Sequence, residues 1–129
     1  MPSLHPDTGP FPGKRFGWVG GEPDGSARMA AASFYAALMG AECLALAGAE
    51  GPVIVEGAFG GNLAFLRMLA TATGRVVRGA GQGAGTGLGA ALLAGPLQAK
   101  GSAEVEVQPA SDPLWTGYVA AWRDAVARW

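Results

Sequence analysis

The 129-residue chain has a single cysteine, Cys43, and a single histidine, His5. One cysteine excludes an intrachain disulfide and a cysteine-based metal cluster. With only one cysteine and one histidine, we also expect no catalytic Cys–His pair. No cluster of histidine and carboxylate residues has the spacing of metal ligands. We therefore expect neither catalytic nor metal-binding residues here, with Cys43 as a small buried side chain and His5 in solvent.

Charge is also scarce: nine basic and ten acidic residues make up 15% of the chain and leave a net charge of −1. This balance predicts no nucleic-acid partner and no anionic membrane surface. The N-terminus lacks the apolar core of a signal peptide. Of the uncharged stretches, Met29–Ala41 is too short to span a bilayer, and Gly79–Ala99 is interrupted by seven glycines. We expect a cytoplasmic protein without a membrane partner.

Glycine, in contrast, is abundant, with 22 residues where the average usage of roughly 7% would give about nine. The glycines follow no collagen-like period, so we expect them at turns and at close backbone contacts. Residues 1–24 hold more than half of the prolines and show no sustained periodicity. They predict an irregular Pro/Gly-rich lead-in, followed by one domain over residues 25–129.

The pattern of apolar residues predicts alternating helices and strands. Asp24 is a candidate N-cap for a helix over Ala27–Ala47, which is apolar on nearly all faces and is therefore expected to be buried. After Gly48 the order is strand, helix, strand, helix, over Val53–Val55, Asn62–Thr73, Arg75–Arg78 and Gly87–Ala94. Because consecutive parallel strands need a crossover, this order predicts an α/β fold: a parallel sheet with packed helices.

The C-terminal third predicts one further strand and one further helix. Ala103–Val107 alternates glutamate with apolar residues, and Asp112-Pro113 is typical of a helix start. In that helix, apolar residues spaced by three and four positions share one face: Trp115, Tyr118, Trp122, Val126 and Trp129. This face lacks interleaved basic residues, so packing is a better interpretation than nucleic-acid stacking.

Two glycine-rich segments follow the predicted strands and are the candidate sites. Glu56–Asn62 joins a strand to a helix, where small residues let a ligand approach free backbone N–H groups. A tight turn capped by Asn62 is the alternative interpretation. The second segment contains one Gly-x-Gly-x-x-Ala match at Gly85–Ala90, but it begins seven residues after the strand, so a dinucleotide site is weakly indicated. No Gly-Lys-Ser/Thr phosphate loop occurs.

Taken in order, four segments resemble the C-terminal domain of FGGY-family carbohydrate kinases: Val53–Asn62, Leu66-x-x-Leu69-Ala70, Thr73–Val77 and Gly85–Ala94. The resemblance covers about residues 25–95, and the aromatic helix with Tyr118 and Trp122 is similar to the closing helix of that family. It implies part of the C-terminal lobe of the actin/hexokinase-like (ribonuclease H-like) ATPase fold.

The family transfers the γ-phosphoryl group of ATP, bound with Mg, to a sugar or polyol hydroxyl. By resemblance, the adenosine of ATP or ADP would bind at Gly57, Ala58, Phe59 and Asn62, which match the family's Gly-Gly-x-x-x-Asn/Ser loop. Ala58 departs from this pattern, because its methyl group replaces the second glycine. No residue identifiable in this chain would ligand the Mg.

The resemblance also shows what cannot be located: the N-terminal kinase domain, the catalytic aspartate and a Gly-Thr phosphate turn. Positioning and charge neutralisation provide most phosphoryl-transfer catalysis, so we expect no activity from the isolated chain and leave its status as an enzyme open. The expected partner is a separate N-terminal kinase domain or a second copy of the chain. The alternatives are a non-catalytic interaction module that uses the Trp122 face, and a small Rossmann-like dinucleotide-binding domain.

Overall fold

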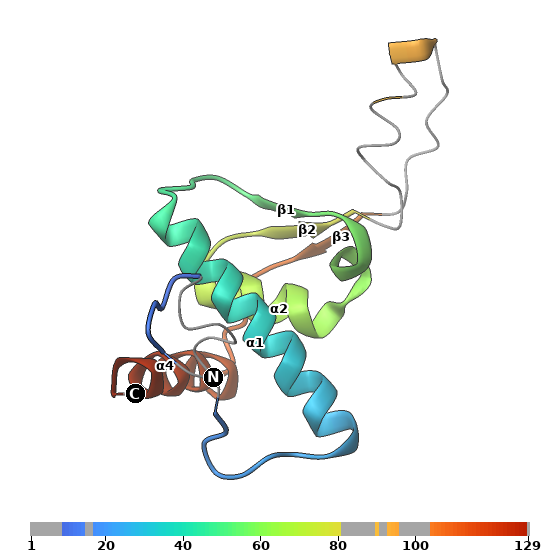
Figure 1. Cartoon of the computed structure of the whole chain (residues 1–129). Coiled ribbons are helices and arrows are strands. Elements are labelled where there is room, and N and C mark those ends of the chain that lie inside the picture. Colours follow the sequence, from blue (N-terminus) through green and yellow to red (C-terminus); the bar gives the residue numbers. More distant parts are fainter. Residues whose placement is uncertain (1–8, 15–16, 81–89, 91–92, 96–103, 129) are drawn as a thin grey trace.

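A computed structural model describes residues 9–14, 17–80, 90, 93–95 and 104–128 (Figure 1). Within these residues, a three-stranded sheet lies over helix α2, helix α1 crosses α2, and helix α4 lies on the side away from the sheet. The predicted helix Gly87–Ala94 and the motif Gly85–Ala90 lie largely outside the described residues. The described part of the lead-in, residues 9–14 and 17–24, contains no helix or strand.

The sheet has the order β1-β2-β3, formed by Val53–Val55, Val77–Gly79 and Val105–Val107. Strands β1 and β2 are parallel, as predicted, and Val53 lies opposite Val77. Strand β3 pairs antiparallel with β2, so the sheet is mixed rather than wholly parallel. The predicted strand Arg75–Arg78 begins two residues and ends one residue before β2, because pairing with β1 decides which residues of this segment join the ladder.

Helix α2, Leu63–Thr73, is the centre of the core. Asn62 caps its N-terminus, and Gly74 ends it in the left-handed conformation at a φ of 67°. Both terminal signals were readable in the sequence. One face of the sheet packs on this helix, and the core continues to α1 and α4 through these buried side chains: Leu38, Leu66, Met68, Leu69, Val77, Val119 and Trp122.

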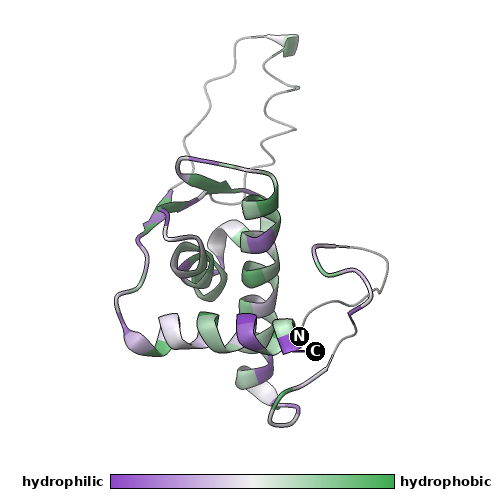
Figure 2. Cartoon of the chain, turned by 90° about the vertical axis from the view of Figure 1, so that its left-hand side faces the viewer, coloured by the Kyte–Doolittle hydropathy of each residue, from purple (hydrophilic) through white to green (hydrophobic). Residues whose placement is uncertain are grey.

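Helix α1, Gly25–Leu46, was expected to be buried on all sides, and this expectation is wrong. Only Ala37, Leu38 and Ala41 are buried, and Cys43 is exposed rather than buried. Figure 2 shows that apolar colour continues along this helix. By length and composition α1 could cross a membrane, although core helices of soluble proteins meet the same criteria.

Helix α4, Pro113–Arg128, begins where the sequence predicted, and the Asp112 carboxylate accepts a hydrogen bond from the Leu114 N–H at 2.8 Å. Its aromatic face packs inward: Trp122 is 6% exposed, and Trp115 packs partly buried against the core. The packing prediction is confirmed for Trp115, Trp122 and Val126, whereas Tyr118 is 38% exposed and Trp129 lies outside the described residues. Trp122 therefore does not provide an exposed contact surface. The Phe11 ring of the lead-in meets the Trp122 ring edge-on, at a centroid distance of 5.7 Å.

Candidate functional site

The candidate site is built on the short connection between strand β1 and helix α2. Residues Gly57–Gly61 form a 3₁₀ helix, labelled η1, where the sequence indicated only a glycine-rich turn. Gly57 opens this turn at a φ of 74°, a left-handed conformation that a residue with a Cβ adopts only with strain. A Cβ added there would meet no atom within 4 Å, so the glycine is required by backbone conformation rather than by crowding.

Gly60 and Gly79 have a different role, because the backbones of η1 and β2 touch at these residues. A Cβ on Gly60 would collide with the carbonyl oxygen of Ala80, and one on Gly79 would collide with the carbonyl oxygen of Gly60. The Ala80 N–H also donates to the Val55 carbonyl oxygen at 2.9 Å. The two strand ends are thereby held against the turn, which fixes the position of η1 relative to the sheet.

Asn62 connects η1, α2 and α1. Its Oδ1 accepts a hydrogen bond from the Phe65 N–H at 3.1 Å, and its Nδ2 donates to the Ser33 Oγ of α1 at 3.0 Å. A side-chain amide has two N–H donors and two acceptor lone pairs, so one of each remains for a ligand. Asn62 is therefore a helix cap, as predicted, and still has hydrogen-bonding capacity.

Phe59 provides the largest apolar surface of the turn. Its side chain is 45% exposed, and its ring lies 4.6 Å from the Phe65 ring, centroid to centroid. Ala58 beside it is exposed, and a Cβ added to Gly61 would meet nothing within 4 Å. The arrangement offers a half-exposed aromatic ring beside accessible backbone, which suits a planar, uncharged ring system.

The structure thus brings Gly57, Ala58, Phe59 and Asn62 together on one turn and its helix cap. Sequence reasoning missed Ser33 as a partner of Asn62, and it missed the close contact between Gly60 and Gly79. Glycines at both strand ends were visible, but their mutual contact depends on strand pairing. Among the described residues, no three histidine, cysteine, aspartate or glutamate side chains could together hold a metal ion.

Two comparisons relate this chain to known proteins. A sequence model described as "Carbohydrate kinase FGGY, C-terminal domain" matches residues 1–105. The solved structure of a carbohydrate kinase from Novosphingobium aromaticivorans superposes with a TM-score of 0.78 at 33% sequence identity. That match covers 97% of this chain and 27% of the other, so the chain spans about a quarter of that kinase. A search among curated proteins found no match.

The family match spans most of the chain, including strands β1 and β2, the turn η1 and the cap Asn62. The structural match supports the α/β class predicted from the sequence and is consistent with the actin/hexokinase-like fold. The resemblance read from the ordered motifs is therefore confirmed: the chain belongs to the FGGY carbohydrate kinase family and corresponds to its C-terminal domain.

Proposed function

We propose that the chain is the nucleotide-binding portion of a carbohydrate kinase, and that η1 holds the adenosine of ATP or ADP. The observation that carries this proposal is the exposed aromatic ring of Phe59 beside open backbone at Gly57 and Gly61. In this proposal the adenine lies against Phe59 and the ribose approaches the glycines. Asn62 provides a hydrogen bond with the amide proton that its two observed contacts leave free.

The triphosphate and its Mg extend away from this turn in the proposal. The described residues include no group of three carboxylate, histidine or cysteine side chains for a metal. Mg bound with ATP neutralises phosphate charge during phosphoryl transfer. We propose that the Mg, the γ-phosphate and the sugar or polyol hydroxyl are handled by an N-terminal kinase domain. The isolated chain then binds nucleotide without turnover, and the whole enzyme acts in the cytoplasm.

The binding test uses a substitution that closes the turn without straining the backbone. Gly61→Leu fills the open space beside Phe59, and Gly117→Leu adds the same side chain at an equally open position on α4. Isothermal titration with ATP and ADP measures the affinity of the chain and of both variants. We expect about 5- to 150-fold weaker binding for Gly61→Leu and unchanged binding for Gly117→Leu, because stacking on one aromatic ring is worth about 1–3 kcal/mol per base.

Equal affinities for the two variants would place the nucleotide elsewhere and refute the assignment to η1. A coupled assay for ADP release, with ATP and a panel of sugars and polyols, tests the second half of the proposal. The chain alone is expected to form no ADP. Mixed with an N-terminal FGGY kinase domain, it is expected to form ADP, and no gain over either part alone would count against complementation.

A further inference from the structure

The two outer strands of the sheet, β1 and β3, differ in charge. Both are edge strands among the described residues, because β2 lies between them. Strand β3 carries a carboxylate at Glu106, with Glu104 directly before it, and such charges discourage an edge from pairing with a further strand. Strand β1 has the uncharged sequence Val-Ile-Val, which favours strand pairing, and it forms the rim of the sheet in Figure 1. Its edge therefore lacks the protection that β3 has.

Ile54 presents the unpaired backbone groups of the β1 edge. The Val53 N–H donates to the Val76 carbonyl oxygen at 2.9 Å. The Ala80 N–H donates to the Val55 carbonyl oxygen, also at 2.9 Å. Because alternate residues of a parallel strand bond to the same neighbour, the N–H and C=O of Ile54 point away from β2. The Ile54 side chain is 65% exposed, so an added strand would gain backbone hydrogen bonds and cover apolar surface.

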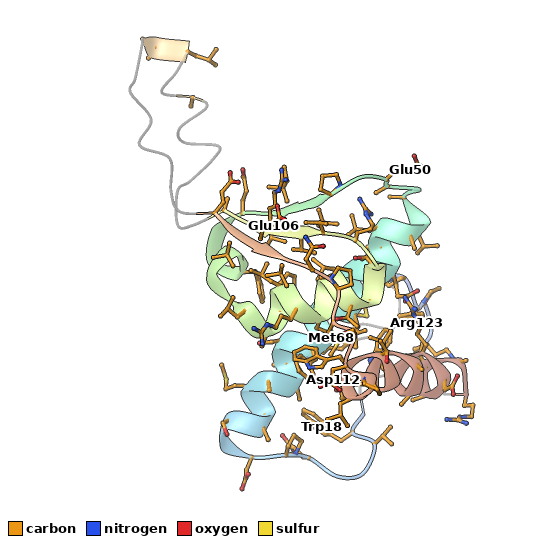
Figure 3. All side chains as sticks on the ribbon, turned by 180° about the vertical axis from the view of Figure 1, so that it is seen from behind. Trp18, Glu50, Met68, Glu106, Asp112 and Arg123 are labelled. Carbon is orange, nitrogen blue, oxygen red and sulfur yellow. The ribbon has the colours of Figure 1, made fainter. Side chains whose placement is uncertain are left out.

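A hollow with excess positive charge adjoins the beginning of β1, on the face of the sheet away from α2. It has a volume of about 400 Å³ and is lined by Gly51, Pro52, Arg75, Val76, Arg78 and Glu106. The Arg78 guanidinium is paired with the Glu106 carboxylate at 3.0 Å. In Figure 3, Glu106 lies on the sheet, at the end of the molecule away from α4. The Arg75 guanidinium donates only to uncharged carbonyl oxygens within the described part of the chain, so its charge is not neutralised there.

Glu56 carries the opposite charge at the other end of β1. Its backbone is extended, with a φ of −107° and a ψ of 166°, so its side chain lies on the same face of the sheet as that of Ile54. Glu56 is exposed and belongs to none of the ion pairs formed between described residues. A second β1 strand, antiparallel and centred on Ile54, would place its Glu56 opposite Pro52. Its carboxylate would then face the hollow that contains Arg75.

We propose that two copies of the chain pair antiparallel along β1, with Ile54 at the two-fold axis and Glu56 of each copy in the hollow of the other. The two Ile54 residues exchange two backbone hydrogen bonds, and each Glu56 N–H donates to the Pro52 carbonyl oxygen of the other copy. The opposite charges at the two ends of one strand make the edge self-complementary, which selects a second copy as the occupant. This pairing does not require a nucleotide on η1.

The first test measures the mass of the full chain in solution. Sedimentation equilibrium covers concentrations from about 10 µM to about 1 mM, because an interface of two short strands gives weak, transient association. We expect the average mass to rise toward twice that of one chain. Ile54→Lys places like charges at the axis and should weaken association at least tenfold. Leu114→Lys adds the same charge at an 80% exposed position on α4 and should leave association unchanged.

A charge exchange tests whether the partner is a second copy. Glu56→Arg brings like charges together in the hollow, and we expect about 2- to 30-fold weaker association, as for the loss of two exposed ion pairs. Adding Arg75→Glu to this variant restores opposite charges and should recover the association. A merely structural role of either side chain would not give this recovery.

Cross-linking tests the register and does not depend on the charge variants. In a Cys43→Ser background, Ile54→Cys places two cysteines in a hydrogen-bonded antiparallel pair, with Cα atoms about 5.5 Å apart, within disulfide range. Mild oxidation should link this variant faster than Leu114→Cys in the same background, and equal rates would overturn the register.

A chain that stays monomeric at the highest concentration, or that associates equally well with Ile54→Lys, would overturn the proposal. A monomeric chain whose Ile54 amide resonance shifts only when an N-terminal FGGY kinase domain is added would also overturn it, and would assign the β1 edge to that domain. Nucleotide titration of the Ile54→Lys variant keeps the two proposals apart, because binding at η1 should persist in the monomer.

Discussion

Helices α1 and α2 are both apolar, yet α2 buries six of its 11 residues and α1 only three of its 22. Helix α2 is enclosed by the sheet, by α1 and by α4, whereas α1 contacts the rest of the domain mainly along one side (Figures 1 and 2). The difference shows that an apolar sequence identifies side chains whose burial would be favourable. The elements packed against a helix decide which of its apolar side chains are buried.

The largest expected effect compares one methionine from each helix. Met68 of α2 is fully buried, and Met29 of α1 is 71% exposed. We expect Met68→Ala to lower the free energy of unfolding by about 2–5 kcal/mol, through lost transfer energy and a cavity. Met29→Ala should change it by less than about 0.5 kcal/mol. Urea denaturation followed by circular dichroism measures both, and similar losses would mean that α1 is covered in solution.

The second comparison uses glycine. Gly79→Ala places a methyl group against the Gly60 carbonyl oxygen and within 2.8 Å of Leu66 Cδ1, so we expect a loss of about 1–3 kcal/mol. Gly40→Ala on α1 places its methyl group 3.9 Å from Leu69 Cδ1, an ordinary contact. Its better helix propensity should then stabilise the chain by up to about 1 kcal/mol. Thermal unfolding midpoints should therefore move in opposite directions, and a shift in the same direction would refute the packing described for Gly79.

The smallest expected effect concerns the two N-caps. Asn62 caps α2 with its side chain, whereas the Asp24 side chain makes no capping hydrogen bond to α1. Asn62→Ala is expected to cost about 0.5–2 kcal/mol, and Asp24→Ala close to nothing. Equilibrium denaturation of the two variants decides the comparison. A measurable cost for Asp24→Ala would show that α1 is capped in solution.

The site was predictable from the sequence to the extent that its signals are local. Gly57, Ala58, Phe59 and Asn62 lie within six consecutive positions, and the order of strand, turn and cap is readable along the chain. The contacts that hold the turn in place were not readable. Gly60 against Gly79, and Asn62 against Ser33, join residues far apart in the sequence, and no local pattern reports which of them meet.

The sequence by itself determined the helix ends at Asn62, Gly74 and Asp112, the strand Val53–Val55, and the family, because caps, glycine stops and ordered motifs act over a few residues. Only the tertiary structure decided the antiparallel pairing of β3 and the exposure of Cys43 and Tyr118. These depend on which surfaces meet after the chain folds. Burial is a property of the neighbours as much as of the residue.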